Sequence, residues 1–342
     1  MKYTVRWGDE HMPVAVLTVE PDKPGRPWWL APDDDWVAGG WDVVPGIERG
    51  LDVYGNAKRP PGVPPVLADC IPDGFARQVI VREQRKRRQD NPQLQPRLDP
   101  LDHILAIDDE TRLGALRFQG PDGSFLAQRA EGVHRVPPII DITLTANAIR
   151  RIEEDSETAQ DLAYLRGHGS SLGGLRPKCS MRDEQGTLWL AKFPSVSDQG
   201  PICAWELVAL SLARQCGIEV PDFRAIAVDD QRIAAVIRRF DRDADGARLG
   251  YCSAAAALGE GAGPDPTYDD LVEVLRRHGA DPFANHVSDL FRRLLFMAAI
   301  TNTDDHLHNH GLLHVEGGSW RLAPAFDLNP DPHGPREFKT AL

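Results

Sequence analysis

A polar cluster near the C-terminal end of the sequence carries the groups best able to do chemistry. The apolar run Leu294–Ala298 leads into it, and a second short apolar run then leads to Asp327. A helix this apolar is normally buried, so its polar end is brought to the interior or to a cleft, where carboxylates need partners. Carboxylate and amide oxygens are the ligands that Mg²⁺ takes when it is bound to a nucleotide. The residues of the cluster are Asn302, Asp304, Asp305, His306, His308, Asn309 and His310.

The spacing within this cluster suggests a specific reaction. Asp304 and Asn309 are five positions apart, which is the spacing of the base Asp and the metal-binding Asn in a protein-kinase catalytic loop. Asp327 follows after a short hairpin and can be the second metal ligand. The hypothesis is therefore a site that binds Mg²⁺ and a nucleotide.

A strand lysine and a helical glutamate could complete such a site. Lys192 ends the strand LWLAKF; a strand lysine usually faces solvent, and the functional alternative is contact with nucleotide phosphates. The next helix, Pro201–Cys216, carries Glu206, and a strand Lys followed by a helical Glu is the arrangement that positions the phosphate-binding lysine of kinases. Beside Glu206 runs an apolar stripe at helical spacing, which we expect to face the core: Trp205, Val208, Ala209, Leu212 and Cys216.

A Gly/Ser-rich stretch, GHGSSLGGLRPK at Gly167–Lys178, precedes a pair of predicted strands. Such a turn can present backbone N–H groups to phosphates. It matches neither the Walker A pattern nor GxGxxG, so a flexible hairpin loop is an equal alternative.

Composition restricts the class of protein. The 342 residues are 42% hydrophobic and include eight Trp, which indicates a globular protein with room for two lobes. The net charge of −12 argues against non-specific binding to nucleic acid or anionic membranes. Because there is neither a long apolar span nor a signal-peptide core, we expect a cytoplasmic protein. Five cysteines without a CxxC pair indicate reduced thiols rather than zinc or disulfides.

The order of predicted elements gives the fold class. Mixed α/β segments come first and helices follow, which is the layout of a bilobal kinase. We therefore predict an α+β, bilobal, protein-kinase-like fold in three parts. These are an N-terminal subdomain at 1–130, a kinase N-lobe at 131–240 and a helical C-lobe at 241–342.

Assembled in order, the motifs resemble the HipA family, the serine/threonine-kinase toxins of bacterial toxin–antitoxin modules. The resemblance covers most of the chain. It rests on IPDGFAR and DDETRLGALRF in the N-terminal part, and on SSLGGLRPK, LAKFP, WELVALSLARQCGIEVP, RRFDR, TNTDDHLHN and LAPAFDL in the kinase part.

The resemblance implies roles for individual residues. Asp304 would be the catalytic base, Asn309 and Asp327 the Mg²⁺ ligands, and Lys192 the lysine that contacts the phosphates of ATP, positioned by Glu206. Ser171, or its neighbour Ser170, would be the autophosphorylated loop serine, whose added charge repels nucleotide phosphates. The other nucleotide-contacting residues implied are Phe240 in the adenine linker, His306, Gly173, Gly174 and Lys178.

The resemblance also implies partners and a length. It implies a protein substrate with a Ser or Thr hydroxyl and a small DNA-binding antitoxin of HipB type, without direct sequence-specific DNA binding by this chain. Family members carry further C-terminal helices, so we expect the helical lobe here to be incomplete and the helix Pro282–Thr301 to expose apolar surface.

Two alternatives stay open. The first is a non-catalytic nucleotide- or partner-binding module of the same fold, favoured by the short C-lobe. The second is a metal-dependent hydrolase, because HxH pairs bind Zn²⁺ or Fe²⁺; its ligands would be His306, His308, His310, His314 and Asp327. Within the kinase interpretation, we expect Asp305 to be a structural loop carboxylate and Asp241 a structural ion-pair partner.

Overall fold

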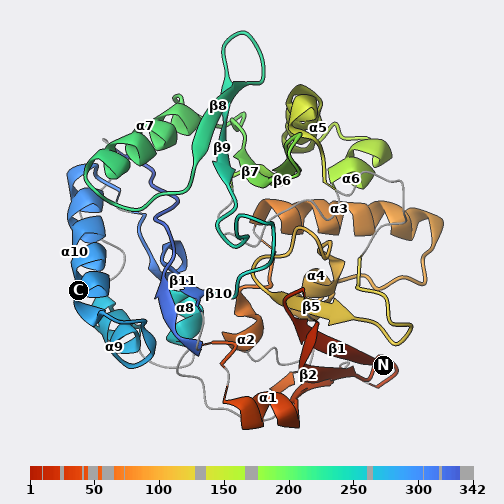
Figure 1. Cartoon of the computed structure of the whole chain (residues 1–342). Coiled ribbons are helices and arrows are strands. Elements are labelled where there is room, and N and C mark those ends of the chain that lie inside the picture. Colours follow the sequence, from red (N-terminus) through yellow and green to blue (C-terminus); the bar gives the residue numbers. More distant parts are fainter. Residues whose placement is uncertain are drawn as a thin grey trace.

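The computed structural model describes most of the chain. The described residues are 1–9, 11–23, 27–40, 42–44, 53–55 (backbone only), 65–72, 74–127, 136–165, 176–259, 265–302, 304–315 and 318–331. In this part of the chain the strands form three antiparallel sheets. The α+β, bilobal kinase-like class predicted from the sequence is thus realised, and Figure 1 shows the arrangement.

The N-terminal sheet has the strand order β4-β3-β2-β1-β5. Buried positions alternate with less buried ones along the last strand, β5, and the core of the sheet includes Val5, Leu17 and Phe118. Three short helices accompany it. The bounds are β1 (Lys2–Trp7), β2 (Met12–Val19), β3 (Trp28–Pro32), β4 (Val53–Gly55), β5 (Leu116–Gln119), α1 (Asp34–Gly39), α2 (Pro65–Ala68) and α4 (Pro100–Ala106). The 3₁₀ turn η1 (Ile139–Asp141) packs instead against the core of the second sheet.

The second sheet has the order β6-β7-β9-β8 and is the one that positions Lys192. Helix α7 packs against β8 and β9 on one side, while α5 and α6 contribute to the core on another (Figure 1). The bounds are β6 (Lys178–Arg182), β7 (Leu188–Lys192), β8 (Phe223–Ala227), β9 (Ile233–Arg238), α5 (Ile142–Glu153), α6 (Ala159–Leu165) and α7 (Ile202–Gln215).

The third sheet, β10-β11-β12, packs with the C-terminal helices. The polar cluster identified in the sequence lies directly before its middle strand, β11. Helix α9 begins at a capping box in which Thr267 and Asp270 bond reciprocally to each other's backbone N–H. The bounds are β10 (Tyr251–Ser253), β11 (Gly311–His314), β12 (Trp320–Leu322), α8 (Ala254–Ala257), α9 (Tyr268–His278), α10 (Phe283–Ala299) and η2 (Leu307–Asn309).

Helix α3 (Gly74–Asp90) joins the N-terminal part to the second sheet. It contacts α6 and β6, and its Phe75 and Val79 lie in the same core as Trp189 of β7. The division at residues 130 and 240 stays a prediction, since segments on both sides of residue 130 share this core. Among the described residues, no helix combines the length and apolar character needed to cross a membrane.

The predicted apolar face of α7 is wrong for Val208, Leu212 and Cys216, whereas Ala209 is buried as predicted. Val208 is 56% exposed and Leu212 is 44% exposed, whereas the buried face carries Cys203, Glu206 and Leu210. The small inner side chains allow the helix to pack closely on β9, and the charged Glu206 turns inward because Lys192 pairs with it. On α10, the expected exposed apolar surface is present, since Phe291 and Leu295 are 61% and 56% exposed.

Candidate active site

A buried lysine held between two carboxylates is the centre of the site. Lys192, at the end of β7, places Nζ 2.5 Å from Oε1 of Glu206 on α7 and 2.6 Å from Oδ1 of Asp327, which follows β12. The side chains of Lys192 and Glu206 are nearly inaccessible, while that of Asp327 is 21% exposed. The strand lysine and the helical glutamate meet as the sequence indicated.

The charges of this triad stabilise one another. Burial alone would lower the pKa of Lys192, but the carboxylates of Asp327 and Glu206 raise it above its ordinary value. Burial alone would raise the pKa of Asp327, yet Lys192 and Lys178 hold it well below its usual range. Burial raises the pKa of Glu206, although Lys192 opposes that shift. Asp327 is therefore the carboxylate of the triad that is kept ionised most firmly.

Asp327 sits in a backbone conformation that is unusual for its residue type. Its φ of +59° is left-handed, which a non-glycine residue adopts only where its surroundings enforce it. Asn329 donates its Nδ2 to Oδ1 of Asp327 at 3.1 Å, and Asn302 donates to the Asp327 carbonyl oxygen at 3.5 Å. These amides fix the carboxylate beside Lys192.

A small cavity lies against the triad. It is bounded by Lys192 and Asp327 at one end and by the rings of Phe240 and Phe326, whose centroids are 5.2 Å apart, at the other. Leu190 of β7 and Ile237 of β9 contribute apolar walls. The cavity has a volume of about 20 Å³, room for about one water molecule, so a nucleotide ring would enter only if these walls moved apart. Phe240 was expected to line an adenine pocket, and the structure places it in this wall.

The segment after β9 is fixed by a buried ion-pair network. Asp241 accepts hydrogen bonds from Arg239 at 2.7 and 2.6 Å, from Arg242 at 2.7 Å and from the backbone N–H of Gly114 at 2.8 Å. All three charged side chains are buried. The structural role predicted for Asp241 is consistent with this network, which joins the linker of Phe240 to the N-terminal part of the chain.

The loop between α10 and β11 presents the proposed base. The side chain of Asp304 is exposed, while its backbone carbonyl oxygen accepts a hydrogen bond of 3.3 Å from Nδ2 of the buried Asn309. This bond fixes the amide of Asn309 and so places the two predicted catalytic-loop residues next to each other. Their roles stay predictions.

Asp305 and His310 form a separate, buried pair. His310 Nε2 lies 3.1 Å from Asp305 Oδ2, and the hydroxyl of Tyr268 donates to the same carboxylate. Because this carboxylate is enclosed by its partners, it braces the loop and the base of α9. The structural role predicted for Asp305 fits this geometry.

The histidines do not assemble into the alternative metal site. His308 is exposed, His306 is half-buried with its ring edge-on to that of His308, and His314 stands between the rings of Trp7 and Trp320. Among the described residues, no three His, Cys, Asp or Glu side chains gather as metal ligands. His306 was also predicted to lie near the nucleotide, but it is not among the residues that line the small cavity.

The predicted phosphate loop lies largely outside the described residues. This applies to Ser170, Ser171, Gly173 and Gly174. Lys178, where the description resumes on β6, is buried and stands opposite Lys192 in the β6–β7 register. A second lysine thus adds positive charge next to Lys192.

The residues present are suited to hold Mg²⁺ with a nucleotide. Asp327 is ionised, as a metal ligand must be, and the amide of Asn309 offers an oxygen of the same hard type. Mg²⁺ normally takes only one or two protein carboxylates and fills its shell with water and phosphate oxygens.

Comparison with known proteins shows the family. The profile of the HipA-like C-terminal domain matches residues 170–342, which is half of the chain. The chain belongs to the HipA-like C-terminal domain family.

A solved structure agrees with this HipA-like assignment. The chain superposes on HipA of Shewanella oneidensis MR-1, solved as a toxin–antitoxin complex with HipB and its operator DNA, with a TM-score of 0.65. The match covers 99% of this chain and 78% of the HipA chain at 16% identity, so it shows a shared fold.

Two curated relatives carry kinase names. One is "Putative kinase Y4dM" of Sinorhizobium fredii, 30% identical over 156 residues that make up 42% of this chain and 37% of that protein. The other is a "Putative kinase" of Haemophilus influenzae, 24% identical over 202 residues that make up 51% of this chain and 56% of that protein. The matches thus span between about a third and just over half of the length of these relatives.

Several residues of the HipA-like site escaped prediction. Asn329 and Phe326 flank Asp327 in the motif LAPAFDLNP, which was assigned only its carboxylate. An aromatic residue directly before Asp327 and an amide two positions after it were visible signals. By contrast, the contact of Tyr268 with Asp305 joins residues 37 positions apart, and no local pattern indicates it.

Proposed function

We propose that this chain is an ATP-dependent serine/threonine-protein kinase of the HipA toxin type. The observation that supports it best is the double ion pair of Lys192 with Glu206 and Asp327 beside an apolar slot. A buried lysine so positioned serves as a fixed point charge for nucleotide phosphates, and the neighbouring carboxylate is positioned to hold the cation that accompanies them.

Each residue would act by position and charge. Lys192 contacts nucleotide phosphates, Glu206 keeps that lysine in place, and Asp327 with Asn309 hold Mg²⁺. When bound, Mg²⁺ supplies neutralisation of the phosphate charge. Asp304 accepts the proton of the attacking Ser or Thr hydroxyl. Its carboxylate is exposed, so the hydroxyl of a protein substrate can reach it from solvent.

We propose that the partners and regulation follow the same type. A protein hydroxyl is the acceptor, Ser171 or Ser170 is the autophosphorylated residue, and a small antitoxin of HipB type is a partner. The HipA chain of the solved complex, which has HipB beside it, supports the last of these.

The test is phosphoryl transfer from radiolabelled Mg–ATP by the wild-type chain and by Lys192→Met. We expect the label on protein to fall by about a hundredfold or more in Lys192→Met. Lys86→Met is the matched control, because its ammonium bonds to a backbone carbonyl near α6, away from the cleft, and its transfer should equal that of the wild type. Equal transfer by Lys192→Met would contradict the proposal.

A second candidate function is a nucleotide-binding module of the same fold without catalysis. The apolar surface that α10 exposes at Phe291 and Leu295 favours it, since such a patch is typical of a lobe that needs a partner. Its signature would be saturable Mg–ATP binding in calorimetry without any transfer of label.

A further inference from the structure

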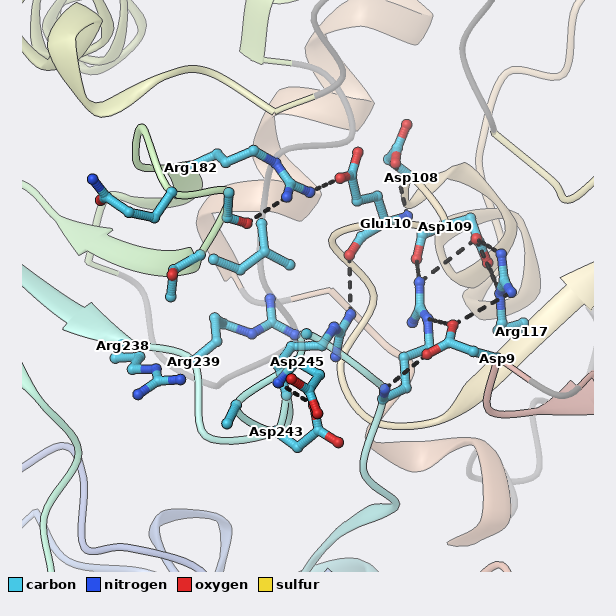
Figure 2. A pocket seen from close by; sticks show the side chains of 18 residues that line it. Asp9, Asp108, Asp109, Glu110, Arg117, Arg182, Arg238, Arg239, Asp243 and Asp245 are labelled. Carbon is cyan, nitrogen blue, oxygen red and sulfur yellow. Dashed lines mark hydrogen bonds and ion pairs between the residues drawn. The ribbon is translucent and has the colours of Figure 1, made fainter.

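A large cavity lies behind the linker that follows β9, on the side away from the triad. Its volume is about 510 Å³, within the range of small-molecule sites. Figure 2 shows its walls: the β6–β7 turn, the linker at Arg238–Asp245, and the segment before β5 at Asp108–Glu110. The cavity therefore forms where the N-terminal part of the chain meets the second sheet.

Arginines from both parts line this cavity. Arg239, Arg242 and Arg248 have side chains that are 7% exposed or less, yet they contribute to its wall. Arg182 and Arg238 stand at its edge, 36% and 35% exposed. The full set is Arg117, Arg182, Arg238, Arg239, Arg242 and Arg248.

The fixed carboxylates are shared among several of these guanidinium groups. Asp241 accepts from both Arg239 and Arg242, and Asp109 pairs with both Arg117 and Arg248. Burial lowers the pKa of Arg248 to about 9, and the nearby Arg242 adds to that shift. Six carboxylates also line the cavity, so its formal charges balance overall, and an anion would bind only where the guanidinium groups converge. These carboxylates belong to Asp9, Asp108, Asp109, Glu110, Asp243 and Asp245.

Arg238 is the most loosely held cation of the set. Its guanidinium lies 3.7 Å from Asp222, a longer separation than the other five have from their nearest carboxylates. Arg182 bonds to Glu110 and, at 2.5 Å, to the carbonyl oxygen of Gly186. Arg238 can turn toward a ligand at little cost, because part of its side chain is already in solvent. Arg182 would have to share its guanidinium between Glu110 and the ligand.

We propose that this cavity binds a phosphate monoester that also carries hydroxyl groups, such as a sugar phosphate. Arg182 and Arg238 would clamp the phosphate oxygens with their planar forks, as guanidinium groups do. Asp245, exposed on the turn at the mouth, and Asp243 beside it would accept hydrogen bonds from the hydroxyls (Figure 2).

The site would also influence the small cavity at Lys192, on the other side of the linker. Arg238 and Arg239 line both this cavity and the small cavity at Lys192. A ligand that fixes Arg238 therefore acts on the segment carrying Phe240. By thermodynamic reciprocity, the cavity ligand changes the affinity for the nucleotide by the same factor by which the bound nucleotide changes the affinity for the cavity ligand. This second effect rests on the proposed function, whereas binding itself does not.

The test is isothermal calorimetry of the full chain with ribose 5-phosphate, with inorganic phosphate and with ribose. Ribose 5-phosphate should bind most tightly, inorganic phosphate more weakly, and ribose not measurably. Arg182→Gln and Arg238→Gln should each weaken binding about tenfold, the loss of one charge-assisted contact. Arg150→Gln, which removes an exposed, ion-paired arginine of α5 outside the cavity, should leave binding unchanged.

Several outcomes would overturn the proposal. These are no binding of ribose 5-phosphate to the folded wild type, binding of ribose as tight as that of its phosphate, or equal affinity in the wild type and both arginine variants. Loss of ribose 5-phosphate binding in Lys192→Met would show that the compound binds beside Lys192 instead, which would also contradict the proposal. If ribose 5-phosphate binds but Mg–ATP does not, the cavity site stands and the proposed kinase function fails.

Discussion

Asp241 and Asp327 are both aspartates that pair with buried cations; Asp241 lies within the linker after β9, and Asp327 lies beside Lys192. Asp241 accepts from two arginines and a backbone N–H, and its side chain is 1% exposed. Asp327 pairs with one lysine, which it shares with Glu206, and its side chain is 21% exposed. The first carboxylate is enclosed by partners, whereas the second keeps an open side.

On the proposed function, this difference separates a structural ion pair from one that takes part in the reaction. An enclosed carboxylate cannot exchange its partners without leaving buried charges unpaired, which is costly. Solvent already reaches Asp327, so under the proposed function it would be able to take a cation or release Lys192 to a phosphate. Its left-handed backbone conformation shows that the surroundings enforce its position. The predictions below test this contrast.

The largest effect on stability should come from Asp241→Asn. Removing this charge leaves Arg239 and Arg242 buried without their carboxylate, so the free energy of unfolding should fall by about 3–5 kcal/mol. Chemical denaturation followed by tryptophan fluorescence measures it. Asp230→Asn, at an exposed carboxylate in the β8–β9 turn, should show no measurable change. If Asp241→Asn were as stable as the wild type, the distinction between the enclosed Asp241 and the partly open Asp327 would fail.

Asp327→Asn should behave in the opposite manner. Phosphoryl transfer from Mg–ATP should fall by about a hundredfold or more, roughly 2.7 kcal/mol or more of transition-state stabilisation. Stability should fall less than in Asp241→Asn, because the carboxylate is partly solvated. Parallel transfer assays and denaturation curves decide the matter. Retained transfer would show that this carboxylate does not act on the cation.

Acid should weaken the fold through the same carboxylates. The folded-state pKa of Asp241 and of Asp327 lies below the ordinary value of 3.8, so both contribute stability above that pH and lose it as the pH falls further. We expect the free energy of unfolding to fall between about pH 5 and pH 2, and to fall less steeply in Asp241→Asn. Because burial raises the pKa of Glu206, which acts in the opposite direction, the slope difference between the two chains is the quantity to measure.

The smallest effect is expected for Leu212→Gln, which is compared with a buried position of the same helix to test the two faces of α7. Leu212→Gln alters a 44% exposed side chain and should change stability by no more than about 0.5 kcal/mol. Leu210→Ala, at a fully buried position of the same helix, should cost about 2–5 kcal/mol. Thermal unfolding of both variants compares them. A large loss of stability in Leu212→Gln would show that Leu212 lies on the buried face of the helix, as the sequence predicted.

Much of the fold could be predicted from local patterns. The strands β6 to β9 and the helices α7, α9 and α10 follow from alternation, helical spacing and the glycine after α7, because these signals are local. The pairing of Lys192 with Glu206 was predictable from the order of a strand lysine and a helical glutamate. The same pairing contains the signal that corrects α7, since a helix that turns Glu206 inward must turn Val208 and Leu212 outward.

The remaining features depend on contacts between distant segments. The cavity behind the linker forms from residues of β6, the linker and the segment before β5, so no single motif indicates it. The strand β10 and helix α8 lie in a stretch rich in Ala and Gly, whose composition favours neither a strand nor an amphipathic helix. They form because β11 pairs with β10 and the core buries the four alanines of α8.

The most direct test is intact-mass and phosphopeptide spectrometry of the chain after incubation with Mg–ATP, on the wild type beside Asp304→Asn. The account predicts an added phosphate on Ser171 or Ser170 in the wild type and none in Asp304→Asn. Equal phosphate in both chains, or none in a wild type that still binds the nucleotide, would contradict it.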